Sequence, residues 1–126
     1  MSVQVLLVED DRFLRKAAEA MLRKNGFTVR TAADGEEGLR SAQTEPPDII
    51  LLDLIMPKLQ GFEVLERLKA DDATASVPVV VLSNLGQEAD VVRAMTAGAA
   101  AYFIKSNTSL ANLVEQVRVV LSGKAA

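Results

Sequence analysis

Apolar runs and helix-like segments alternate five times along this chain of 126 residues. The apolar runs are rich in Val, Ile and Leu, and they lie at residues 3–8, 28–31, 48–53, 77–82 and 100–104. Continuous apolar runs, unlike alternating ones, are typical of strands that are covered on both faces. The pattern therefore predicts an α/β domain with a five-stranded parallel sheet, doubly wound, with helices on both faces.

The segments between these runs are predicted to be helices. Two of them carry an apolar stripe at helical spacing: Leu14, Ala17, Ala18, Met21 and Leu22 in the first, and Leu110, Leu113, Val114, Val117 and Leu121 in the last. Three shorter helices are expected near residues 35–43, 61–69 and 86–97. Asn25-Gly26, Gly98 and Gly123 are expected to end helices, because glycine readily adopts the conformation that follows a last helical turn.

Composition limits the chemistry of the chain. We expect one domain over residues 1–126, with its core at about 3–122. The absence of cysteine and histidine excludes a disulfide framework, a thiolate zinc site and the commonest general base. The net charge of −3 argues against direct nucleic-acid binding, and no apolar run is long enough for membrane insertion. Because no signal peptide is recognisable, a cytoplasmic location is expected.

Four of the predicted strands end in polar residues. The first ends in the acidic run of residues 9–11, the third in Asp53, the fourth in Ser83 and the fifth in Lys105. Doubly wound folds bind ligands at the carboxyl ends of their strands. We therefore expect these side chains to meet in one pocket.

Each of these residues also has an ordinary structural interpretation. Asp11 could cap the first helix, and Ser83 or Asn84 could cap the fourth. Lys105 could be a solvated charge at a strand end, and Asp53 could be a turn residue before Pro57. Four residues with unrelated structural roles would have no reason to lie at the carboxyl ends of four different strands. Their positions therefore favour a shared site.

Converging carboxylates need a positive partner. Two negative charges about 4 Å apart repel by about 4 kcal/mol at an effective dielectric near 20. Oxygen ligands favour Mg²⁺ or Mn²⁺, and one carboxylate could then act as a nucleophile toward phosphorus. A lysine and a hydroxyl would stabilise the charge on the transferred group. The residue set indicates phosphoryl transfer onto aspartate.

Four stretches of the sequence resemble the response-regulator receiver domain of two-component signal transduction: VLLVEDD, DIILLDLIMPKLQGFEVL, VVVLSN and AGAAAYFIKS. Asp53 with Met56, Pro57 and Gly61 is the most specific part of the resemblance. It spans nearly the whole chain and implies a flavodoxin-like strand order 2-1-3-4-5, which the chemotaxis regulators of this family share.

The resemblance implies a role for each site residue. Asp53 is the implied phosphoacceptor, Ser83 the hydroxyl that bonds a phosphoryl oxygen, and Lys105 the lysine that pairs with it. Ser83 and Tyr102 are the implied movable residues of the switch, and Tyr102 matches the aromatic residue that moves inward when the hydroxyl loop closes. The implied metal ligands are Glu9, acting through water, Asp10, Asp53 and the main-chain carbonyl of Ile55.

Two departures from the family pattern stand out. Ser106 occupies the position after the lysine where the family usually has proline, and Ser83 replaces the commoner threonine while keeping the hydroxyl. Ile55 and Leu85 place apolar side chains beside the acceptor. We predict that they limit attack by water and lengthen the lifetime of the phosphoryl group.

The resemblance also implies partners. A sensor histidine kinase, a histidine phosphotransfer protein or a small acyl phosphate would donate the phosphoryl group, since the chain has no histidine. Family kinases dock near the first helix, which is basic here; a solvated helix face is the alternative. The basic residues of that helix are Arg12, Arg15, Lys16, Arg23 and Lys24.

The output surface is expected on the fourth helix, fifth strand and fifth helix. With no effector domain expected after residue 123, the signal would pass to an unknown downstream protein by contact. The activity would be that of a signalling switch that catalyses its own phosphorylation and dephosphorylation, rather than of an ordinary enzyme.

Other functions fit the sequence less well. A flavin-binding domain would need a phosphate loop where the acidic run lies, and no nucleotide-binding glycine motif occurs. Phosphatases of the haloacid dehalogenase type need a second acid two residues after the nucleophilic aspartate, and that position is occupied here by Ile55. The remaining alternative is a receiver-like module that binds proteins without being phosphorylated.

Overall fold

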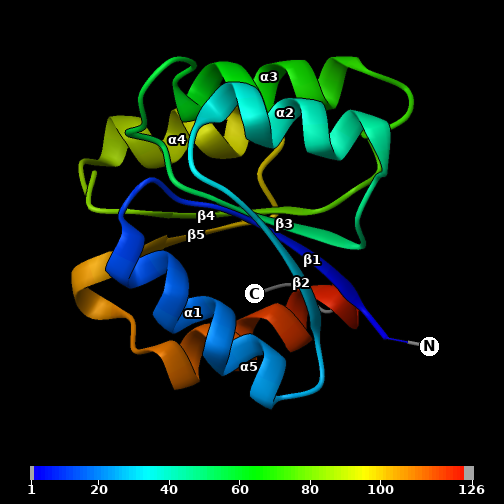
Figure 1. Ribbon diagram of the computed structural model, residues 1–126. Helices are drawn as coiled ribbons and strands as arrows, with labels where there is room; N and C mark the ends of the chain where they lie inside the picture. The colour runs from blue at the N-terminus through cyan, green and yellow to red at the C-terminus, as the bar shows by residue number, and fades with distance from the viewer. Residues whose placement is uncertain (1, 124–126) are drawn as a thin grey trace.

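One parallel sheet forms the centre of the computed structural model, which describes residues 2–123 (Figure 1). Its strands are β1 (Gln4–Val8), β2 (Thr28–Ala32), β3 (Ile49–Leu52), β4 (Val79–Ser83) and β5 (Ala101–Ile104). They lie in the order β2-β1-β3-β4-β5, and every neighbouring pair is parallel. The predicted fold and strand order are confirmed, and the order reverses between β1 and β3.

The helices cover both faces of the sheet. They are α1 (Arg12–Lys24), α2 (Gly35–Thr44), α3 (Gly61–Ala70), α4 (Glu88–Thr96) and α5 (Leu110–Leu121). Helices α1 and α5 pack on one face and α2, α3 and α4 on the other (Figure 1). No helix within residues 2–123 combines the length and apolar character that crossing a membrane requires.

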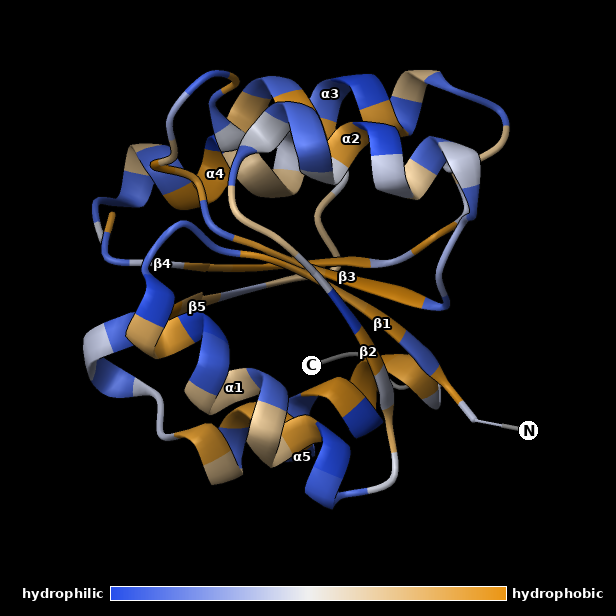
Figure 2. Ribbon diagram, viewed as in Figure 1, coloured by the Kyte–Doolittle hydropathy of each residue, from blue (hydrophilic) through white to orange (hydrophobic). Residues whose placement is uncertain are grey.

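The two faces of the sheet enclose separate apolar clusters. Ile50 and Leu52 of β3 belong to the cluster beneath α2, α3 and α4, while Ile49 and Leu51 belong to the cluster beneath α1 and α5. All four residues of this strand have no exposed surface. Figure 2 shows β3 and β4 in the centre of the sheet coloured mainly as apolar. A continuous apolar run therefore does correspond to a strand that is buried on both sides.

The helix ends follow the predicted signals in part. Asp11 caps α1, since its Oδ1 accepts from the N–H of Leu14 at 3.0 Å. Gly26 and Gly98 adopt positive φ after α1 and α4, as predicted. The alternative in which Ser83 or Asn84 caps α4 is excluded, because Ser83 is the last residue of β4 and the helix begins at Glu88.

Candidate functional site

The register of the sheet brings the polar strand ends to one edge. Val8 of β1 pairs with Leu52 of β3, and Leu52 pairs in turn with Val81 of β4. Glu9 and Asp53, which follow the first pair directly, therefore leave the sheet at the same level. This edge holds the carboxyl ends of the strands, beside the point where strand order reverses.

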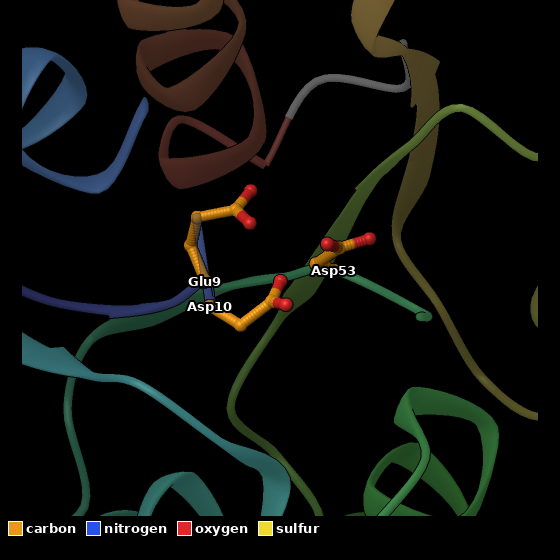
Figure 3. Close-up of side chains that lie close together, drawn as sticks. All are labelled: Glu9, Asp10 and Asp53. Carbon is orange, nitrogen blue, oxygen red and sulfur yellow. The ribbon is translucent and has the colours of Figure 1, made fainter. Parts of the chain in front are cut away.

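Three carboxylates lie together at this edge (Figure 3). One oxygen from each of Glu9, Asp10 and Asp53 lies within 4.8 Å of the others. Glu9 and Asp53 are only 3% and 5% exposed, whereas Asp10 is open to solvent. At an effective dielectric near 20, each pair of charges at this separation repels by roughly 3 kcal/mol. The cluster is therefore stable only with positive charge nearby.

Lys105 supplies one positive charge. Its Nζ lies 2.6 Å from Glu9 Oε1 and 2.9 Å from Asp53 Oδ2, so a single ammonium bridges the two buried acids. The residue begins a short 3₁₀ turn, Lys105–Asn107, that the sequence pattern did not predict. With Ser106 in place of the usual proline, the ammonium still reaches the acidic cluster.

Burial changes the protonation of this group of side chains. It raises the pKa of Glu9 to about 7, although hydrogen bonds from Lys105 and from the N–H of Asp11 oppose the shift, and the charge of Asp53 adds to it. Burial lowers the pKa of Lys105, but its hydrogen bonds to Glu9 and Asp53 outweigh that effect, and the net shift is upward. Lys105 therefore stays charged near neutral pH, while Glu9 can hold a proton there.

Ser83 and Tyr102 are linked through the loop between β4 and α4. Ser83 is fully buried, and its Oγ accepts from the N–H of Leu85 at 3.3 Å. The hydroxyl of Tyr102 donates to the carbonyl of the same Leu85, and its ring packs against the apolar cluster beneath α4. The two residues that the resemblance singled out as movable thus hold the same short loop.

The loop after Asp53 is held from several sides. The N–H of Ile55 donates to Asp53 Oδ1 at 3.3 Å. Lys58 has φ +69°, and the N–H of Leu59 donates across it to the carbonyl of Pro57 at 2.9 Å, which forms a γ-turn. No local sequence pattern indicates this turn, because lysine rarely adopts a positive φ.

Two glycines let the same loop lie close to its neighbours. A Cβ at Gly61 would collide with the Asp53 carbonyl, and one at Gly35 would collide with the Leu59 carbonyl. The Nζ of Lys58 also lies 3.6 Å from Oδ2 of Asp34, the N-cap residue of α2. These contacts support the backbone that carries Asp53.

An apolar hollow of about 260 Å³ adjoins the loop that follows Asp53. Ile55, which is 58% exposed, and Leu85 stand at its sides. The rest of its lining comes from Leu54, Met56, Gln60 and Phe62. Ile55 and Leu85 thus line the same hollow, next to the loop that follows Asp53.

The donor set of the acidic cluster suits a hard divalent cation. Three carboxylate oxygens lie close together, two of them on buried side chains, and the sequence has no imidazole or thiolate to attract a softer metal. Asp10 is exposed, so coordination positions on its side remain open to water or to a ligand oxygen. The residues present therefore fit Mg²⁺ or Mn²⁺.

Residues 5–118 match the family described as the response regulator receiver domain, and the chain belongs to this family. The resemblance seen in the sequence is thereby confirmed. This family consists of the receiver domains of two-component response regulators, and the structure shows the buried acidic cluster at the edge where its ligand site is expected.

Among curated relatives, the transcriptional regulatory protein PrrA of Mycobacterium tuberculosis is 44% identical over 95% of this chain and 50% of its own length. The transcriptional activator protein PfeR of Pseudomonas aeruginosa is 43% identical over 82% of this chain and 33% of its own length. The chain thus spans about half or less of these relatives.

Solved structures agree with this assignment. The chemotaxis response regulator CheY4 of Vibrio cholerae is 27% identical, with a TM-score of 0.88 over 95% of this chain and 99% of that one. A CheY-like receiver domain protein of Methanospirillum hungatei has a TM-score of 0.91 over 98% of this chain and 96% of that one, at 24% identity. The second similarity is evidence for the fold alone.

Proposed function

We propose that this receiver domain accepts a phosphoryl group on Asp53. The observation that carries the proposal is the position of the Asp53 carboxylate, which lies 2.9 Å from Lys105 Nζ and within 4.8 Å of two further acids. A carboxylate that served only as a turn residue would need neither partner. The Asp53 side chain is also almost completely buried, so solvent screens the charge of its carboxylate only weakly.

The reaction would be a direct transfer. An Asp53 oxygen attacks the phosphorus of the donor, the bond from phosphorus to the donor's nitrogen or oxygen breaks, and an acyl phosphate forms on Asp53. Lys105 would move its ammonium from Asp53 Oδ2 to a phosphoryl oxygen, and the Ser83 hydroxyl would donate to another. Water attack on the acyl phosphate would release inorganic phosphate and restore the carboxylate.

Glu9, Asp10, Asp53 and the carbonyl of Ile55 are the proposed ligands of the divalent cation. The cation would neutralise charge on the transferred group, as Mg²⁺ does in other phosphoryl-transfer sites. The structure supports the three carboxylates by their proximity. The support for the Ile55 carbonyl is its position two residues after Asp53. The N–H of Ile55 donates to the Asp53 carboxylate, which keeps this residue close to it.

The donor would be a phosphohistidine on a sensor kinase or phosphotransfer protein, or a small acyl phosphate. The chain has no histidine and so cannot supply this group itself. Arg12 lies exposed at the start of α1, directly after the acidic run, where it could attract an acidic partner.

The signal would be read at the surface of α4, β5 and α5. Val92 and Met95 of α4 are exposed apolar residues there, at 55% and 43%. Tyr102 of β5 connects this surface to the loop that follows Ser83. A phosphoryl group adds roughly two negative charges at Asp53, and a new bond to Ser83 would shift that loop. Several relatives are named transcriptional regulators, so the reader of this face could be an effector domain in a longer protein.

The test is incubation with Mg²⁺ and acetyl phosphate, followed by intact-mass measurement, in the wild type and in Asp53→Asn. We expect one added phosphoryl group in the wild type and none in the variant. Beryllofluoride should perturb the Tyr102 signal in the wild type only. The absence of any response in the wild type would favour the alternative, a receiver-like protein-binding module that is not phosphorylated.

A further inference from the structure

Arg15 binds the loop that carries the acidic pair. It lies on α1, one turn after the helix begins, and its side chain is half-buried. Its Nη1 donates to the main-chain carbonyl of Glu9 at 2.9 Å and to that of Asp10 at 3.2 Å. One guanidinium nitrogen thus holds two consecutive peptide groups at the end of β1.

The second of these peptide groups reaches the Glu9 carboxylate. In a trans peptide the C=O and the N–H point in opposite directions on one rigid plane. The carbonyl of Asp10 accepts from Arg15, and the N–H at the other end of the same peptide, that of Asp11, donates to Glu9 Oε2 at 3.1 Å. Arg15 therefore fixes the plane of the peptide between Asp10 and Asp11, and the N–H of that peptide orients the Glu9 carboxylate. A bond to a charged donor also polarises the peptide and strengthens its N–H as a donor.

This support differs from that of Lys105. Lys105 binds the other oxygen of Glu9, Oε1, and binds Asp53 as well. When Lys105 turns to a phosphoryl oxygen, the N–H of Asp11 remains as the hold on Glu9. That hold depends on the peptide plane that Arg15 fixes.

We propose that Arg15 is a positioning residue of the phosphoryl-transfer site. By fixing the two peptide planes after β1, it holds the Glu9 and Asp10 carboxylates in the arrangement in which they share a divalent cation. The assignment of that cation rests on the proposed function, whereas the contacts of Arg15 stand on their own. Arg15 itself touches neither the acceptor nor the transferred group.

Simple electrostatics makes the opposite prediction. Arg15 is a positive charge near a cation site, so its removal would strengthen Mg²⁺ binding if charge were its only effect. A positioning residue must weaken binding when it is removed. Outer contacts that orient metal ligands typically change metal affinity by about tenfold or more. The sign of the change therefore separates the two interpretations.

The experiment compares Arg15→Met with Lys16→Met in unphosphorylated protein. Lys16 is the next residue of α1 and is exposed, so both variants remove one positive charge from the same turn of the helix. Mg²⁺ affinity is measured by calorimetric titration, and exchange of the Asp11 amide is measured by NMR in metal-free protein. Unfolding curves confirm that each variant is folded, and Arg15→Lys, which retains one donor group, is the second variant.

We expect Arg15→Met to weaken Mg²⁺ binding by about tenfold and to speed exchange of the Asp11 amide, with Arg15→Lys in between. Lys16→Met should leave exchange of the Asp11 amide unchanged, and its Mg²⁺ affinity should be unchanged or slightly higher. Mg²⁺ binding by Arg15→Met that equals or exceeds that of the wild type would overturn the proposal. If the wild type bound Mg²⁺ but took no phosphoryl group, the proposed function would fail and the positioning role could still hold. If the wild type bound no Mg²⁺, both would fail.

Discussion

Without divalent cations, the protein should lose stability as the pH rises from about 5 to about 8, because Glu9 must ionise while it is buried and close to Asp53. The pKa of Glu9 is raised from 4.5 to about 7 in the folded protein, mainly by burial. Between these values the folded state binds a proton that the unfolded state has lost. The free energy of unfolding is therefore highest below pH 4.5 as far as Glu9 is concerned, and it falls as the pH rises through about 7.

The magnitude follows from the shift. One pKa unit corresponds to about 1.4 kcal/mol, so a rise from 4.5 to about 7 corresponds to roughly 3 kcal/mol in total. Most of this falls between pH 5 and pH 8. Solvent screening is weak, since Glu9 is only 3% exposed. The window is also clear of other side chains with ordinary pKa values, because the chain has no histidine and no cysteine.

The assay is urea unfolding followed by circular dichroism in the presence of a chelator, at several pH values across this window. Glu9→Gln should abolish most of the decrease, whereas Glu36→Gln, at an exposed position, should retain it. Saturating Mg²⁺ should reverse the trend, because the cation binds only the folded state and prefers ionised Glu9. Equal pH dependence in the wild type and in Glu9→Gln would refute the reasoning.

Three further predictions concern the loop after Asp53. Lys58→Gly should be more stable to urea than Lys58→Ala by about 1 kcal/mol, since both lose the pair with Asp34 but only alanine keeps an unfavourable positive φ; equal stabilities would contradict the strain. Gly61→Ala should lower the free energy of unfolding by about 2 kcal/mol or more, because the alanine Cβ would meet the Asp53 carbonyl. The same substitution should slow labelling by acetyl phosphate. A variant with the stability and labelling rate of the wild type would count against this. Ile55→Asn should speed loss of the phosphoryl group several-fold, measured as label remaining with time, because it replaces an apolar cover by a side chain that can hold water; an unchanged rate would show that Ile55 does not exclude water.

The fold and the membership of the site could be predicted because they depend on patterns that a sequence displays directly. Buried strands such as Ile49–Leu52 are continuous apolar runs, and the residues that follow them must meet at one edge of a parallel sheet. The exact strand limits were less predictable. For example, β4 begins at Val79 rather than at residue 77, because Pro78 has no N–H to pair with a neighbouring strand.

Other features of the site depend on contacts that no local pattern reveals. The γ-turn at Lys58 is set by the packing of its loop against α2, and glycine or asparagine would have been the usual indication of a positive φ. Arg15 was counted among the basic residues of α1, and its bonds to the Glu9 and Asp10 carbonyls become visible only when the helix is placed beside the end of β1. The alternative role of Ser83 or Asn84 as a helix cap is likewise excluded only by the structure, in which β4 continues through Ser83 and α4 begins at Glu88.

The most direct test of the account is to locate the phosphoryl group in the chain. Protein labelled with acetyl phosphate and Mg²⁺ is reduced with borohydride, which converts an aspartyl phosphate to homoserine, and the product is digested and sequenced by tandem mass spectrometry. The account predicts homoserine at position 53 alone, and none in a sample from which Mg²⁺ was removed. Homoserine at position 10 or 11, or labelling of Asp53 that does not depend on Mg²⁺, would contradict it.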